Sequence, residues 1–212
     1  IEKETFEAIS VIAPNLAKVS KERIQMELTK LLCSEHPEKI REVYETGIST
    51  YVSPAFAALD WQNARVSAAL PKEKYVRWAA FLRCGNSPEN AVRVLRDLKL
   101  DNDTIYRVRT LVEWQGKKVG AEDGGEDCLK HGKEEGMKEI AKQPEPSRAS
   151  IRRAMSQMEP ELFDDLLTLK MCLSEDASDD RESQWLCQVR DLTEEIRSNR
   201  DCISLKTLAV SG

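Results

Sequence analysis

Apolar residues recur along most of this 212-residue chain at the three- and four-residue spacing of one face of an α-helix. No segment sustains the alternation of apolar and polar residues that a half-buried β-strand requires. The sequence therefore predicts an all-α fold built from amphipathic helices. The clearest apolar stripes are Ile24, Leu28, Leu31 and Leu32; Ala91, Val94, Leu95 and Leu98; Ile105, Val108, Leu111 and Val112; and Trp185, Val189, Leu192 and Ile196.

Polar residues mark where several of these helices should begin. Ser20 precedes the first stripe, and its hydroxyl is expected to accept a hydrogen bond from a free N–H of the first turn. Ser87 is a second capping residue, and it is followed by Pro88, whose missing N–H does no harm in a first turn. Asp101 restarts a helix after a short break. We therefore expect helices of about three to four turns joined by short connections.

One long segment, residues 115–146, breaks the helical pattern. It holds six glycines and two prolines among many charged residues. Such a composition is typical of a solvated excursion, here with room for a short helix near residues 133–141. We place a domain boundary in this segment, residues 115–146, which separates residues 1–114 from residues 147–212.

Composition argues against a membrane protein and against a metal centre. No apolar run approaches the length of about 18 residues that a bilayer-spanning helix needs. The six cysteines include no C-x-x-C pair, and His36 and His131 are the only histidines, so the closely spaced ligands typical of a zinc site are missing. Unpaired thiols fit a reducing compartment, and we therefore expect a cytoplasmic protein.

Charge is distributed unevenly along the chain. The net charge is −5, yet residues 72–118 carry eleven basic and six acidic residues. A locally basic surface can bind phosphate groups even on a molecule that is acidic as a whole. The alternative interpretation is that these residues lie on ordinary solvated helix faces.

The sequence shows none of the common catalytic motifs. Neither a Gly-rich phosphate loop nor a G-x-S-x-G sequence is present. Asp164 and Asp165 are adjacent on a predicted helix, so their side chains diverge by about 100° instead of converging on shared metal ions. His36 precedes a proline in a predicted turn, and His131 lies in the polar excursion. We therefore predict no catalytic residue and no metal site within this chain.

A family resemblance begins at residues 19–32, which read V-S-K-E-R-I-Q-M-E-L-T-K-L-L. They resemble S-x-E-R-I-x-x-E-L-x-K-L-L, a motif of bacterial (class II) tRNA nucleotidyltransferases and poly(A) polymerases. Weaker likenesses occur across nearly the whole chain, in the same order as the corresponding segments of the family. Together they resemble the family from its late neck through its body to the start of its tail. These likenesses lie at residues 1–9, 75–82, 98–105, 150–155, 161–167 and 202–212.

This resemblance implies that the chain is part of a larger enzyme. In the family, a head with a D-x-D metal pair and a neck element E-D-x-x-R precede these segments, and we expect both to lie upstream of residue 1. Residues 1–50 would be late neck helices, residues 51–114 the helical body, and residues 147–212 the end of the body and the start of the tail. The implied whole protein uses Mg²⁺, CTP and ATP to add CCA, or part of it, to tRNA 3′ ends, and this segment needs no cofactor of its own.

The same resemblance gives the motif at residues 19–32 an architectural role. Ser20, Glu22, Arg23 and Glu27 would support the neck, and Arg23 and Glu27 stand four residues apart, where they can form an ion pair on one helix. The alternative is that Glu22 or Arg23 contacts an element that lies upstream in the whole protein.

The basic region supplies candidate RNA-binding residues under this resemblance. The body would contact the acceptor and TΨC arms of tRNA by shape and through phosphates, with the catalytic head as its other partner. Arg77 has a second interpretation, as a structural partner at the edge of the core. The alternative functions are a non-enzymatic helical interaction module and a bacterial poly(A) polymerase. The candidate residues are Lys72, Lys74, Arg77, Arg93, Arg96, Arg107 and Arg109, followed by Arg152 and Arg153.

Overall fold

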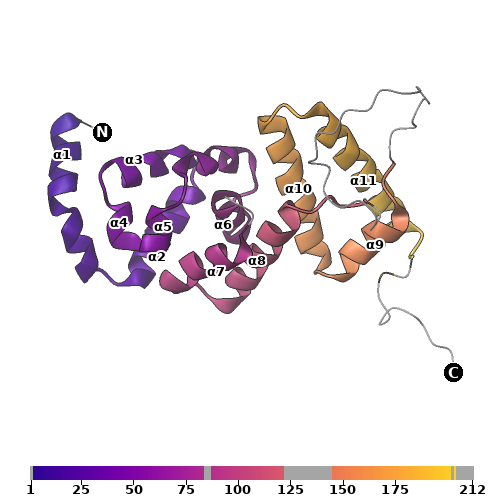
Figure 1. Ribbon diagram of the computed structural model, residues 1–212, viewed down its shortest axis with the longest axis horizontal. Coiled ribbons are helices and arrows are strands. Elements are labelled where there is room, and N and C mark those ends of the chain that lie inside the picture. The colour runs from indigo at the N-terminus through magenta and orange to yellow at the C-terminus, as the bar shows by residue number, and fades with distance from the viewer. Residues whose placement is uncertain (1, 84–86, 122–144, 202, 204–212) are drawn as a thin grey trace, which may run out of the picture.

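A computed structural model of the chain describes residues 2–83, 87–121, 145–201 and 203. These residues form α-helices and short 3-10 helices (η) and include no strand, which confirms the predicted all-α fold. The helices form an elongated body with α1 at one end, α6 to α8 in the middle and α9 to α11 at the other end (Figure 1).

The elements of the N-terminal part are α1 (Lys3–Ile12), η1 (Ala13–Lys18), α2 (Lys21–Leu32), η2 (Pro37–Lys39), α3 (Ile40–Glu45), α4 (Ser49–Val52), α5 (Pro54–Ala57) and η3 (Trp61–Ala69). Those of the remainder are α6 (Lys74–Leu82), α7 (Pro88–Asp97), α8 (Asn102–Gln115), α9 (Arg148–Ser156), α10 (Pro160–Asp176) and α11 (Asp180–Ser198). Helix α6 is the centre of the first part, since every side chain from Val76 to Leu82 is buried.

Two of the three predicted helix starts are capped by their side chains. The Ser87 hydroxyl accepts the Asn90 N–H at 3.2 Å, and an Asp101 carboxylate oxygen accepts the Thr104 N–H at 2.8 Å. Ser20 stands at the N-cap of α2, but its side chain accepts no capping bond, so that detail of the prediction is wrong. A hydrogen bond from Lys99 is the main reason that the pKa of Glu22 lies below its usual range.

The predicted apolar stripes form one continuous core. The stripes of α2, α7, α8 and α11 are buried, with Leu31 and Leu192 only partly covered. Aromatic rings fill the middle of this core, where Phe81 lies 5.8 Å from Phe56 and 6.3 Å from Trp78 between ring centroids. Helix α10 packs on α8, α6 and η3, and thereby joins α9–α11 to the rest of the core.

Hydrogen bonds bring together the residues on either side of positions 122–144. The Ser147 N–H donates to the Gly120 carbonyl at 2.8 Å, and the Ser150 hydroxyl donates to the Ala121 carbonyl. The short helix predicted near residues 133–141 lies outside the described residues, and the domain division at residues 115–146 stays a prediction. Within the described parts of the chain, no helix is long and apolar enough to cross a membrane.

Candidate RNA-binding surface

Arg77 is not a surface residue, which corrects its prediction as an RNA contact. It is 2% exposed, and its guanidinium donates to three carbonyls: Pro71 at 2.9 Å, Leu32 at 3.2 Å and Leu70 at 2.6 Å. Burial lowers the pKa of Arg77. Because Leu32 ends α2, the guanidinium satisfies a carbonyl that has no partner within its own helix. Arg77 therefore holds α2 and the Leu70–Pro71 turn against α6.

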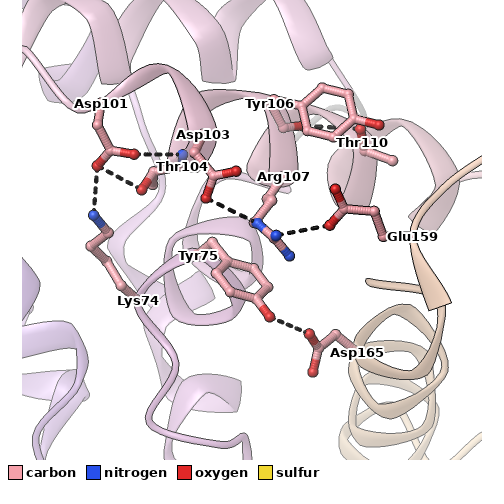
Figure 2. Close-up of polar contacts among 10 residues, drawn as sticks. All are labelled: Lys74, Tyr75, Asp101, Asp103, Thr104, Tyr106, Arg107, Thr110, Glu159 and Asp165. Atoms are coloured by element: carbon pink, nitrogen blue, oxygen red, sulfur yellow. Dashed lines mark hydrogen bonds and ion pairs between the residues drawn. The ribbon is translucent and has the colours of Figure 1, made fainter. Parts of the chain in front are cut away.

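Lys72 and Lys74, which also belong to the predicted set, are each paired with a carboxylate. Lys72 forms an ion pair with Glu35, and the Lys74 ammonium lies 2.7 Å from an Asp101 carboxylate oxygen. The Lys74 hydrogen bond is the main reason that the pKa of Asp101 lies well below its usual range. Asp101 also caps α8, so the Lys74 contact fixes the start of that helix against α6 (Figure 2).

Arg107 is held in a polar network between α8, α6 and α10 (Figure 2). Its Nε lies 3.0 Å from Asp103, its Nη2 lies 2.8 Å from Glu159, and its guanidinium stands 5.1 Å from the Tyr75 ring centroid. The Tyr75 hydroxyl donates to Asp165 at 2.5 Å. Burial, and then the Asp165 hydrogen bond, raise the pKa of Tyr75 to about 12. With two carboxylates and a ring around it, Arg107 serves mainly to join the helices.

Three arginines lie on the outer face of α7 and α8. Arg93, Arg96 and Arg109 are exposed and form no ion pair with any residue that the structure describes. The pKa of Glu113 is lowered first by its hydrogen bond with Lys117 and to a smaller extent by the charge of Arg109. The three arginines line one groove of about 620 Å³ together with the exposed ring of Tyr106. Arg93 and Arg96 are three residues apart on α7, and Tyr106 and Arg109 are three apart on α8, so each pair lies on one helix face.

The groove has mixed polarity. Val92 and Ile105 contribute apolar surface, and Glu89 and Asp97 place two carboxylates beside the three arginines. The buried stripes of both helices pack below, so the arginines stand on a rigid surface. Such a groove can accept a phosphate on its guanidinium groups and a flat apolar group on its tyrosine.

Tyr106 is not among the residues predicted from the sequence, although a signal for it was present. The apolar stripe of α8 consists of Ile105, Val108, Leu111 and Val112, and position 106 falls outside it. An aromatic residue on the outward face of a helix, between the basic positions of α7 and α8, is a feature of nucleic-acid surfaces.

Arg152 and Arg153 lie on α9, apart from the α7–α8 groove. With Ala149 and Ile203 they line a smaller hollow of about 280 Å³. Both side chains interact with other parts of the protein. The nine predicted residues therefore fall into four groups. Arg77 is buried; Lys72, Lys74 and Arg107 pair with carboxylates; Arg93, Arg96 and Arg109 line the groove; and Arg152 and Arg153 lie on α9.

The four residues of the predicted neck motif lie on or beside α2. Glu22 pairs with Lys99, at the end of α7, at 2.9 Å. The predicted pair of Arg23 with Glu27 is not formed, because Glu27 lies 2.7 Å from Lys30 instead. Arg23 and Glu27 border an apolar groove of about 560 Å³ beside the half-exposed Met26. Among the described residues, no three His, Cys, Asp or Glu side chains are grouped so that they could hold a metal ion.

These features define an all-helical protein with an arginine- and tyrosine-lined groove of the kind that binds nucleic acid. Residues 1–59 match the family described as "Probable RNA and SrmB-binding site of polymerase A". Over 77 residues the chain is 42% identical to "CCA tRNA nucleotidyltransferase 1, mitochondrial" of Danio rerio. Over these parts of its length, the chain is similar to members of the tRNA nucleotidyltransferase and poly(A) polymerase family.

The likeness covers limited parts of both proteins. The alignment with the Danio rerio enzyme covers 33% of this chain and 18% of that protein. No solved structure gives a significant match to the chain. The family match at residues 1–59 contains nine acidic and seven basic residues, so the arginine groove on α7 and α8 lies in a different and more basic part of the chain.

Proposed function

We propose that this chain is the RNA-binding and positioning part of a tRNA nucleotidyltransferase that adds CCA, or part of it, to tRNA 3′ ends. The observation that carries the proposal is the groove of α7 and α8, which Arg93, Arg96 and Arg109 line together with Tyr106 without forming ion pairs among the described residues. Most other cations of the basic region are engaged with carboxylates or carbonyls. A free guanidinium is a strong phosphate ligand because it donates two parallel hydrogen bonds.

The rigidity of this surface suits the positioning of a large substrate. Val94, Leu95, Val108 and Leu111 are fully buried between α7, α8 and α6, which fixes the direction in which the arginines point. Phosphate contacts of this kind set the register of an RNA without reading its sequence. The acceptor and TΨC arms of tRNA would lie along this face and present the 3′ end to a catalytic head.

The chemistry itself would take place in that head. The family resemblance would place Mg²⁺, CTP and ATP there. Glu22, through its contact with Lys99, would link the neck helix α2 to the turn that follows α7. This contact supports the architectural role of the motif over a direct contact with an upstream element.

A bacterial poly(A) polymerase is the second candidate, favoured by the description of the family that residues 1–59 match. It uses the same chemistry on a different RNA primer. The name of the Danio rerio relative favours tRNA as the substrate, and it also places that relative in mitochondria. A cytoplasmic location for the present protein is part of the proposal. The non-enzymatic helical module has no specific observation in its favour.

A tRNA-binding titration of the full chain tests the proposal. Replacing Arg93, Arg96 and Arg109 together by Glu should weaken binding of a tRNA transcript by at least about tenfold at about 50 mM salt. The salt dependence should also flatten, since each phosphate contact that is lost lowers the slope by about one. Arg65→Glu, at an exposed arginine outside the groove, is the control for a single charge reversal and should change the affinity little. Equal affinities of the triple variant and the control would contradict the proposal.

A further inference from the structure

Tyr106 is the one large aromatic side chain that faces the arginine groove among the residues described there. It is 48% exposed on the outer face of α8, while the preceding residue Ile105 is buried. The Thr110 hydroxyl donates to the Tyr106 carbonyl at 2.9 Å. The next residue, Arg107, turns toward Tyr75 and Glu159, and the Tyr106 ring lies away from that network (Figure 2). The ring is therefore available to a ligand that enters the groove.

A contact made only to phosphates can use the hydroxyl of a tyrosine but makes no use of the face of its ring. Binding the backbone of a duplex requires cations on a surface, and the bases remain stacked inside the helix. An unpaired nucleotide instead offers a flat base that stacks on an aromatic ring, with charged phosphates on either side. The groove provides both kinds of partner, since Arg93, Arg96 and Arg109 line it together with the ring and Val92 adds apolar surface.

We propose that the groove of α7 and α8 takes an unpaired nucleotide of RNA. Its base stacks on the Tyr106 ring, and the neighbouring phosphates pair with Arg93, Arg96 and Arg109. The inference rests on the proposed function, because it names the form of RNA that this surface binds. The groove volume of about 620 Å³ lies within the range of sites that enclose small ligands, and it suits a single nucleotide better than the broad face of a duplex.

An acidic peptide is the other polyanion to consider. It would use the three arginines, but it has no need of an exposed aromatic face. The two carboxylates of the groove, Glu89 and Asp97, would also repel closely spaced acidic side chains. In an extended RNA strand, neighbouring phosphates are separated by a nucleoside. The base can therefore stack on the Tyr106 ring while the phosphates contact the guanidinium groups.

The experiment measures binding of the full chain to two labelled probes by fluorescence anisotropy. One probe is a single-stranded RNA of about ten nucleotides, and the other is a blunt duplex of the same sequence. Tyr106→Ala should weaken binding of the single strand by about fivefold or more, as expected when one base loses its stacking partner, and should change binding of the duplex by less than about twofold. Tyr106→Phe should retain the affinity, because the ring is kept.

Two further variants separate stacking from packing and folding. Tyr106→Leu keeps apolar bulk without a ring face and should behave like Tyr106→Ala. Tyr51→Ala, at another exposed tyrosine on α4, is the matched control and should bind both probes normally. Circular dichroism spectra and thermal midpoints confirm that each variant is folded.

The possible outcomes distinguish failure of the stacking site from failure of the proposed function. If the arginine variants weaken both probes but Tyr106→Ala weakens neither, the stacking site is wrong and the proposed function stands. If the arginine variants also bind normally, the proposed function itself fails. Displacement of the single strand by a Glu-rich peptide of equal charge, as effectively as by unlabelled RNA, would make the groove a general anion site and overturn the inference.

Discussion

At the scale of single residues, Gly120 is a backbone position with no room for a side chain. Its φ is +85°, and a Cβ atom placed there would lie 2.9 Å from the Pro146 Cβ and 3.2 Å from a Val189 methyl group. We expect Gly120→Ala to lower the free energy of unfolding by about 2 kcal/mol or more, the sum of backbone strain and overpacking. Urea unfolding measures the change.

Gly47 provides the control for that prediction. Its φ is +76°, but a Cβ atom there would meet nothing within 4 Å. Gly47→Ala should therefore cost only the backbone strain, about 1 kcal/mol. Equal losses at both positions would show that the contacts with Pro146 and Val189 add nothing.

Arg77 gives a second prediction at this scale, because its role in the fold excludes a direct role in RNA binding. Arg77→Ala removes the partner of the Leu32, Leu70 and Pro71 carbonyls and leaves a cavity in the core. We expect it to lower the free energy of unfolding by about 3 kcal/mol or more. The RNA affinity of the folded fraction should stay within about twofold of the unchanged protein. A stable variant that loses RNA binding would contradict this assignment.

At the scale of elements, Lys170 ties α10 to the end of α8. It is 7% exposed, and its ammonium donates to the Gln115 carbonyl at 2.7 Å. Burial lowers the pKa of Lys170 to about 8 from an ordinary value of 10.5. Between these two values the unfolded chain holds more protons than the folded chain, so the contribution of Lys170 to stability rises with pH across that window.

The test compares the unchanged chain with Lys170→Met between about pH 7 and pH 10. The stability of the unchanged chain relative to the variant should rise across that range, by roughly 2 kcal/mol in total. The comparison cancels the titration of other groups, because both proteins contain them. A difference that stays constant or falls with rising pH would mean that Lys170 is not held charged in a desolvated position.

Helix faces and caps could be predicted from the sequence, whereas the contacts between helices could not. The stripes of α2, α7, α8 and α11 were predictable because they depend on local periodicity, and so were the caps at Ser87 and Asp101. The partners of the basic side chains were not, because they come from distant parts of the chain. Arg107, for example, pairs with Glu159 across the joint between α8 and α10, and no local pattern reveals that contact.

At the scale of the whole molecule, the position of α10 decides whether the chain is one folding unit or two. Phe163 and Leu166 of α10 are fully buried in a core that also contains Phe56 and Trp78. The Tyr75–Asp165 and Arg107–Glu159 contacts add polar links across the same joint. This continuity favours a single cooperative unit over the division that the polar segment at residues 115–146 predicts.

Native-state hydrogen exchange of two core variants decides the question. Phe163→Ala in α10 should lower the opening free energy of the most protected amides in both α8 and α10 by the same amount, about 3 kcal/mol. Phe56→Ala in α5 should do the same from the other end of the molecule. Both residues are fully buried phenylalanines, so the two variants are matched. If each variant instead weakened protection only on its own side of α8, the two parts would unfold separately, and the boundary would lie where the glycine-rich segment places it.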